Sequence, residues 1–147
     1  MKVGVIGVGY WGIKHVDEYI QLGHDVIICD KSQGNIKNCK KRFDTVEIKN
    51  LETILNEKEV TCVSICTPND THYDIASKCL IAKKHVFLEK PISTNIEDAN
   101  KLIELSERNN VILQVGHIYR FNNSVQKARE LINNFELGHI YSVNFSW

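Results

Sequence analysis

The 147-residue sequence has no excess of charge of either sign, because 18 Lys and Arg residues balance 18 Asp and Glu residues. Nucleic acids and anionic membrane surfaces are bound through basic surfaces, so the balance argues against both as main partners. The sequence also has no apolar run near the ~20 residues that a membrane-spanning helix needs. Its first residues, MKVGVIGVGYWG, are too rich in glycine for a secretory signal.

Metal-ligand spacing is missing as well. The five cysteines include no C-x-x-C pair, and Cys29, Cys62 and Cys66 lie inside apolar runs. The spacings of a zinc site are therefore absent, and we expect no bound metal. Free cysteines in apolar surroundings are typical of the reducing cytoplasm, where we expect this protein to reside.

What the sequence does contain is an alternation of short apolar runs with amphipathic stretches. The runs are VGVIG (3–7), DVIIC (25–29), VTCVSIC (60–66), HVFLE (85–89) and VILQVG (111–116), with a weaker TVEI (45–48). Runs of this length rich in Val and Ile are typical of strands buried on both faces. The repeated alternation of a strand with a helix predicts an α/β fold with a doubly wound parallel sheet, in which TVEI is an edge strand.

Several residues predict where the helices begin and end. Gly23 is placed as a C-terminal stop for the first helix. Thr71 with Asp74, and Thr94 with Glu97, have the spacing of a capping box at the start of two later helices.

The pattern changes near residue 121. An amphipathic helix ended by Gly138 is followed by HIYSVNFSW (139–147), in which large apolar and polar residues alternate. Alternation indicates a strand with one solvated face, as in an antiparallel sheet. We therefore predict a first domain at 1–121 and, at 122–147, the helix and first strand of a truncated second domain. Its uncovered apolar face favours association through 139–147, as a homodimer or with a subunit that supplies the missing domain.

A glycine motif lies between the first strand and the first helix. Gly7, Gly9 and Gly12 form G-x-G-x-x-G, and Asp30 follows 18 residues later at the end of the next apolar run. This context predicts a dinucleotide site, with Gly7 in the turn, Gly9 open to a pyrophosphate and Gly12 packed against the strand. Asp30 would accept hydrogen bonds from the adenosine ribose and repel a 2′-phosphate. The alternative is a glycine-rich turn without a ligand.

Two further segments follow strand ends, where ligands bind in such folds. In CTPNDTH (66–72), His72 taken alone is more often an exposed helix residue than a ligand contact. In FLEKPIS (87–93), Lys90 either forms a surface ion pair with Glu89 or lies in a cleft, where its ammonium polarises a carbonyl or alcohol oxygen. The X-Pro bond after Lys90 is a candidate for the cis form.

Together, GVIGVGYWG, Asp30, TPNDTH, EKP and GHIYRFN resemble, in order and near spacing, the Gfo/Idh/MocA family of NAD(P)-dependent sugar oxidoreductases. The GYWG and GHIYRFN segments look most like the branch that oxidises UDP-N-acetylhexosamines at C3. The resemblance implies a Rossmann fold, NAD as the cofactor and a sugar or nucleotide sugar as the substrate. It also implies a second domain, a mostly antiparallel sheet that supplies an Asp and a His for proton transfer.

The resemblance implies particular roles for individual residues. Glu89 would contact the ribose on the nicotinamide side, and Lys90 would be the catalytic or orienting lysine. His117 would transfer a proton or, more plainly, position the carboxamide next to Gly116. The implied cofactor contacts are Gly7, Gly9, Tyr10, Trp11, Gly12, Asp30, Thr67, Pro68, Asn69, His72, Glu89, Lys90 and Arg120.

Two functions remain open at this point. The chain is either the NAD(H)-binding portion of a sugar or nucleotide-sugar dehydrogenase, or a non-catalytic NAD(H)-binding module that acts as a sensor or as one subunit of a split oxidoreductase.

Overall fold

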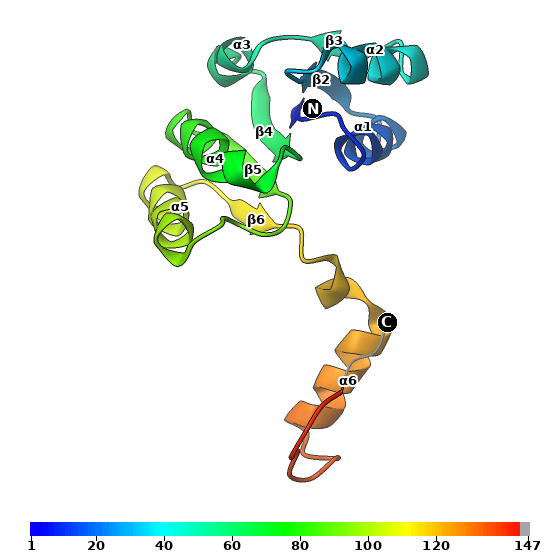
Figure 1. The fold of residues 1–147 in the computed structure, drawn as a ribbon, viewed down its shortest axis with the longest axis vertical. Coiled ribbons are helices and arrows are strands. Elements are labelled where there is room, and N and C mark those ends of the chain that lie inside the picture. The colour runs from blue at the N-terminus through cyan, green and yellow to red at the C-terminus, as the bar shows by residue number, and fades with distance from the viewer. Residues whose placement is uncertain (145–147) are drawn as a thin grey trace. The chain divides into compact units, whose positions relative to one another are not determined.

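A computed structural model describes residues 1–144, and its first 116 residues are built around one six-stranded sheet (Figure 1). The strand order is β3-β2-β1-β4-β5-β6, and all neighbouring pairs are parallel. The strands are β1 (Lys2–Ile6), β2 (Asp25–Cys29), β3 (Glu47–Ile48), β4 (Val60–Ile65), β5 (His85–Leu88) and β6 (Leu113–Val115). The predicted parallel sheet is confirmed, with TVEI supplying the short edge strand.

Helices cover both faces of this sheet, as a doubly wound fold requires. They are α1 (Gly12–Gln21), α2 (Gln33–Arg42), α3 (Leu51–Asn56), α4 (His72–Ile81) and α5 (Ile96–Asn109). In β2, Ile27 packs into an apolar cluster with α3, α4 and α5, whereas Val26 and Ile28 pack with α1 and α2. Successive strand side chains point to opposite faces, so each strand contributes to two cores.

The start of α4 differs from its predicted capping box. The Thr71 side chain does not cap the helix, because its hydroxyl donates to the Pro68 carbonyl (2.7 Å) and lies 2.8 Å from Thr67 Oγ1. A short 3-10 turn, η1 (Asn69–Thr71), precedes α4, and the Thr71 hydroxyl forms its hydrogen bond at the start of this turn. The prediction for Thr71 and Asp74 was therefore wrong.

The start of α5 is shifted by one residue from its predicted cap. Asn95 is the N-cap, and its Oδ1 accepts from the Asp98 amide at 2.8 Å, whereas Thr94 and Glu97 were predicted. Asparagine is a stronger N-cap than threonine, which explains the shift. At the end of α1, Gly23 has φ +77° and confirms the predicted stop.

Residues 117–147 form a second compact unit. It contains a 3-10 turn, η2 (Ile118–Phe121), and α6 (Asn123–Asn133), whose N-cap Asn122 accepts from the amides of Ser124 and Val125. Residues 139–144 form no strand, so the predicted terminal strand is wrong there, while 145–147 lie outside the described residues. A strand needs a neighbour for its backbone N–H and C=O groups, and no described segment pairs with this one. The functional boundary at 121/122 stays a prediction.

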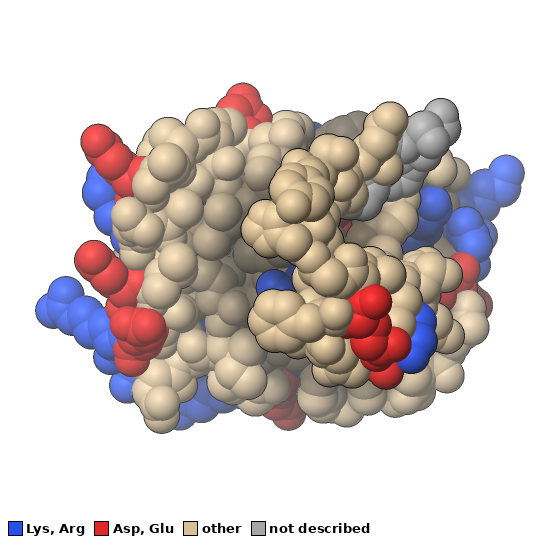
Figure 2. Space-filling model, turned by 90° about the horizontal axis from the view of Figure 1, so that it is seen from below, with Lys and Arg blue, Asp and Glu red and all other residues tan. Residues whose placement is uncertain are grey.

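The surface charges of the described residues are mixed. On the face in Figure 2, Lys and Arg side chains lie interspersed with Asp and Glu side chains around the edge. Within residues 1–144, no helix is both long and apolar enough to cross a membrane.

Candidate cofactor site

The candidate site lies where the strand order reverses. The chain runs from β1 to β2 and β3 on one side, then crosses back to place β4 beside β1 (Figure 1). Just past the strands, the Gly7 amide donates to the Cys29 carbonyl at 2.7 Å and the Cys66 amide to the Ile6 carbonyl at 2.8 Å. The glycine turn therefore sits between the carboxyl ends of β2 and β4, at the switch point where open α/β sheets bind ligands.

The three glycines of the turn face different surroundings. Gly7 has φ +85°, and a Cβ there would lie 2.8 Å from Thr67 Cγ2. A Cβ on Gly12 would lie 1.8 Å from the Gly7 carbonyl oxygen. A Cβ on Gly9 would meet only Asn35 Nδ2, at 3.9 Å. Gly7 and Gly12 are thus required by the packing of the chain itself, whereas Gly9 borders open space that a ligand can enter.

The start of α1 is open to an anion. Among the described residues, the amides of Gly9, Tyr10 and Trp11 have no hydrogen-bond acceptor. No side chain caps the helix, and its first turn contains no acidic residue. Unpaired N–H groups at the positive end of a helix dipole are suited to a phosphate group, so this turn fits the pyrophosphate of a dinucleotide.

The two aromatic residues of the motif lie on the outside of the turn. Tyr10 is 72% exposed and Trp11 46%. Their rings meet edge to face at 5.2 Å, and Lys14 Nζ lies 4.2 and 4.3 Å from the two ring centroids. The lysine adds positive charge near the start of α1.

Asp30 is fixed by three donors at the end of β2. Its Oδ2 accepts from the Val8 amide (2.8 Å) and from Asn35 Nδ2 (3.1 Å), and its Oδ1 accepts from the Ser32 amide (2.7 Å). These contacts tie the carboxylate to the glycine turn. Oδ2 already accepts twice, so Oδ1 is the oxygen that keeps capacity for a ligand hydroxyl. Asn35 was missed by the sequence reasoning, because it is one polar residue among several in an exposed helix.

His72 is not an exposed helix residue, because its ring is completely buried. Nδ1 lies 2.8 Å from the Pro91 carbonyl oxygen and Nε2 lies 3.0 Å from that of Thr67. The buried ring therefore links the loop after β4, through Thr67, to the loop after β5, through Pro91. Both nitrogens face carbonyl oxygens of these loops, so any influence on a cofactor would act through the loops. Pro68 and Asn69 are exposed on the loop after β4.

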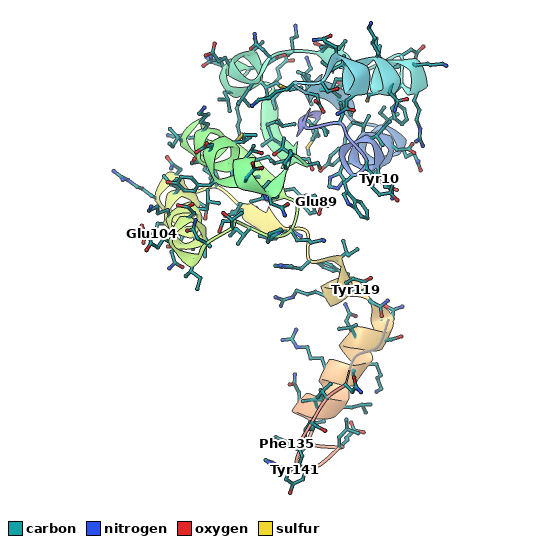
Figure 3. All side chains as sticks on the ribbon, viewed as in Figure 1. Tyr10, Glu89, Glu104, Tyr119, Phe135 and Tyr141 are labelled. Carbon is teal, nitrogen blue, oxygen red and sulfur yellow. The ribbon has the colours of Figure 1, made fainter. Side chains whose placement is uncertain are left out.

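Glu89 follows β5 and lies at the same edge of the sheet as Tyr10 (Figure 3). Lys90 is the next residue in the chain. The Glu89 amide donates to the Ile65 carbonyl at 2.9 Å. Its Oε1 lies 3.2 Å from His15 Nε2, and its Oε2 accepts from the Lys90 amide at 3.2 Å. The surface ion pair between Glu89 and Lys90, our alternative, is therefore not formed.

The Lys90 side chain is exposed, and its ammonium has no partner among the described residues. The bond from Lys90 to Pro91 is cis, as the sequence suggested. Lys90 is therefore a cation at this edge that is free to contact a ligand oxygen.

Gly116 joins this group, whereas His117 and Arg120 belong to the second unit. The Gly116 amide donates to the Leu88 carbonyl at 2.8 Å, and a Cβ on Gly116 would lie 3.5 Å from Glu89 Oε1. His117 is exposed, and its carbonyl accepts from the Arg120 amide at 3.0 Å. The roles predicted for these two side chains stay predictions.

Cys66, beside the glycine turn, is poorly suited to be a nucleophile. Burial raises the pKa of its thiol to about 12, and the Glu89 carboxylate acts in the same direction. The neutral thiol predominates at physiological pH, so it serves packing rather than chemistry.

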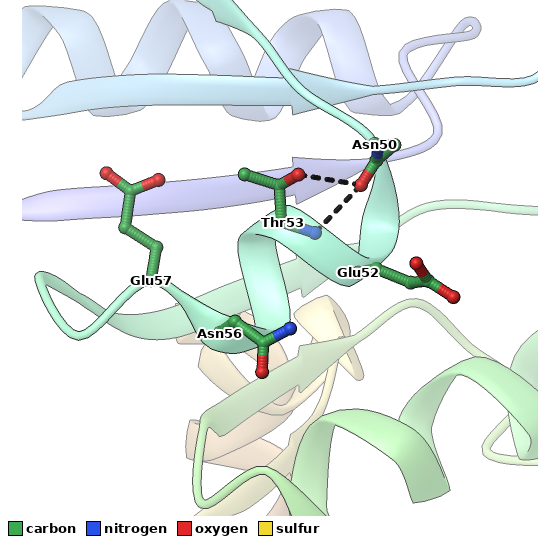
Figure 4. Close-up of a pocket in the computed structure, with 5 residues that line it drawn as sticks. All are labelled: Asn50, Glu52, Thr53, Asn56 and Glu57. Atoms are coloured by element: carbon green, nitrogen blue, oxygen red, sulfur yellow. Dashed lines mark hydrogen bonds between the residues drawn. The ribbon is translucent and has the colours of Figure 1, made fainter.

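A pocket elsewhere on the sheet does not compete for the cofactor. It lies against α3 and is lined by Asn50, Glu52, Thr53, Asn56 and Glu57 (Figure 4). Its lining includes two carboxylates and no basic residue, which is unfavourable for the phosphates of a dinucleotide. Among the described residues, no group of three His, Cys, Asp or Glu side chains is arranged to hold a metal.

Comparisons with known proteins identify the family of this chain. Residues 1–117 match the Gfo/Idh/MocA family, described as "Oxidoreductase family, NAD-binding Rossmann fold". The chain belongs to this family, and its cofactor is a nicotinamide dinucleotide. The predicted family, fold and cofactor are therefore confirmed.

Two relatives and one further solved structure are similar to the chain. The chain is 34% identical over 97% of its length to 2,7-anhydro-N-acetylneuraminate hydratase of Escherichia coli, and 29% identical over 88% to UDP-N-acetylglucosamine 3-dehydrogenase of Acidithiobacillus ferrooxidans, whose structure superposes with a TM-score of 0.77. A structure of scyllo-inositol dehydrogenase from Lactobacillus casei, 23% identical over 95% of the chain, shares the fold with a TM-score of 0.84. The chain spans 38–43% of the length of these proteins. It corresponds to the NAD-binding portion of such oxidoreductases.

Proposed function

We propose that this NAD-binding portion serves a dehydrogenase that oxidises a carbinol carbon of a sugar or a nucleotide sugar. The observation that carries the proposal is the free, exposed Lys90 ammonium, which follows Glu89 directly at the edge occupied by the glycine turn. A cation at this position can stabilise the negative charge that develops on a substrate oxygen.

The residues divide into those that hold the cofactor and those that meet the substrate. The amides of the glycine turn would bind the pyrophosphate, and Asp30 would bind the adenosine ribose. Glu89 would bind the second ribose. When bound, the nicotinamide supplies the hydride acceptor. Lys90 would hold the reacting oxygen, and His117 would position the carboxamide or transfer a proton.

The relatives support the substrate class. The names of the Escherichia coli and Acidithiobacillus ferrooxidans proteins both refer to N-acetylated sugar derivatives. One is a hydratase and the other a dehydrogenase, so the family's site supports two net reactions on related compounds. Lys90 as an oxygen-binding cation is compatible with both, and oxidation of a nucleotide sugar is the reaction we propose.

Substrate binding and complete proton transfer would need a second, mostly antiparallel domain, which we place after a boundary at 121/122. Segment 139–147 would be the contact with that domain or with a second copy of the chain, in the cytoplasm. Within its described part, Tyr141 is 90% exposed and Val143 62%. Light scattering on the chain and on a shortened protein that ends at Gly138 tests this contact. The same oligomeric state for both proteins would rule the segment out as an interface.

The main test combines cofactor binding with turnover. Calorimetry on the 147-residue chain should show NADH binding, and Lys90→Ala should retain it. Formation of NADH from UDP-N-acetylglucosamine should require an added second domain and should be lost with Lys90→Ala. Lys78→Ala, a surface lysine of α4, is the matched control. Undetectable NADH binding would refute the proposal. Binding without turnover in any form would favour the non-catalytic module.

A further inference from the structure

His15 lies between α1 and the carboxyl ends of two strands. Its Nδ1 is 2.7 Å from Oγ of Ser64 in β4, and its Nε2 is 3.2 Å from Oε1 of Glu89 after β5. Its ring also meets the Phe87 ring edge to face, with centroids 5.4 Å apart. Ser64 is completely buried, while the side chains of His15 and Glu89 are only 17% and 14% exposed.

The hydrogen-bond chemistry assigns a direction to these contacts. An ionised carboxylate only accepts hydrogen bonds, whereas a serine hydroxyl both donates and accepts. His15 Nε2 must therefore carry a hydrogen and donate a hydrogen bond to Glu89. Nδ1 then accepts from the Ser64 hydroxyl in the neutral ring. The Glu89 carboxylate thus sets the tautomer of His15, and Ser64 holds the other nitrogen of the ring.

Both oxygens of Glu89 are held in this way. His15 holds Oε1, and the Lys90 amide holds Oε2 at 3.2 Å. Gly116 lies beside this carboxylate, since a Cβ there would meet the Phe87 ring at 3.3 Å and Glu89 Oε1 at 3.5 Å. These two hydrogen bonds from His15 and the Lys90 amide orient the carboxylate before any ligand binds. Each oxygen still has a lone pair that can accept from a ligand hydroxyl.

We propose that His15 is a positioning residue that orients Glu89 toward the ribose on the nicotinamide side of the cofactor. This inference rests on the proposed role of Glu89. Since α1 carries both His15 and the phosphate-binding turn, one rigid helix sets the spacing between the two halves of the cofactor site. The function is not evident from the sequence, because the two residues are 74 positions apart.

Three ligands separate the two halves of the site. ADP contains the adenosine and both phosphates, ADP-ribose adds the second ribose, and NADH adds the nicotinamide. Calorimetry with His15→Leu should show affinities for ADP-ribose and NADH reduced about tenfold, the value of one charge-assisted hydrogen bond, with ADP unchanged. His15→Gln keeps a donor near the Nε2 position and should restore most of the loss.

Two further proteins complete the design. His24→Leu, a histidine at the end of α1 outside the site, should bind all three ligands as the unchanged protein does. In a Glu89→Gln background, His15→Leu should cause no additional loss of ADP-ribose affinity, because the two residues act as one unit.

The outcomes are distinguishable. If His15→Leu weakens ADP as much as NADH, or weakens neither, His15 does not position Glu89. If the unchanged protein binds ADP-ribose no more tightly than ADP, the role of Glu89 itself is wrong. If it binds none of the three ligands, the proposed function fails. Thermal unfolding of each variant shows whether a loss of binding reflects a loss of fold.

Discussion

The glycine turn allows the ligand role of one glycine to be separated from the structural role of another. Gly9→Ala places a methyl group where the nearest heavy atom is 3.9 Å away, and its backbone does not have the positive φ that disfavours alanine. The folded state should tolerate this change. Because alanine restricts the unfolded chain more than glycine, the free energy of unfolding should stay equal or rise by about 0.4–1 kcal/mol.

Cofactor binding should respond in the opposite direction. The added methyl group occupies the space through which the pyrophosphate approaches the free amides of the turn. Loss of one or two hydrogen bonds to a charged group corresponds to roughly 10- to 100-fold in affinity. Urea unfolding and NADH calorimetry on the same preparation measure both quantities.

Gly12→Ala is the matched comparison. Its Cβ would lie 1.8 Å from the Gly7 carbonyl oxygen, so the turn must move and unfolding should become easier by about 1–3 kcal/mol or more. Unaltered NADH affinity in a fully folded Gly9→Ala protein would refute the placement of the pyrophosphate. A large loss of stability in that protein would refute the open space assigned to Gly9.

Four further predictions concern other residues. Asp30 should make the chain bind NADH more tightly than NADPH in calorimetric titrations, because its carboxylate repels a 2′-phosphate; equal affinities would contradict this. His72→Leu should reduce the free energy of unfolding by roughly 1–3 kcal/mol, because a buried carbonyl oxygen loses its N–H donor; an unchanged free energy of unfolding in urea would be inconsistent with its buried contacts. Cys66 and Cys79, whose thiol pKa values burial raises to about 12, should resist a thiol reagent at about pH 8 until the chain is unfolded, as peptide mapping can show. Burial lowers the pKa of Lys84 in the folded protein from its usual 10.5. Between this lowered pKa and 10.5, the unfolded state binds more protons than the folded state, so the free energy of unfolding should rise with pH across that window. Lys84→Met should remove that rise in urea unfolding measured across the window, and an unchanged pH profile would argue against the shift.

Local patterns in the sequence predicted the sheet well and the helix starts less well. Apolar runs such as DVIIC became buried strands because their burial on both faces is a property of the run itself. Helix starts depend on competition between neighbouring polar residues. Asn95 replaced Thr94 as a cap, and the Thr71 hydroxyl was used by the preceding turn. The terminal strand expected at 139–144 did not form, because a strand is completed only by a partner.

The sequence by itself determined the α/β fold, the glycine turn with Asp30, and the placement of Glu89 and Lys90 at a strand end. These features depend on periodicity and on turn chemistry, which act over a few residues. Only the tertiary structure decided that the Glu89 side chain pairs with the His15 ring and not with the Lys90 ammonium, and that His72 is buried between two loops. Such pairings depend on strand order and on how helices lie across the sheet, which no local pattern records.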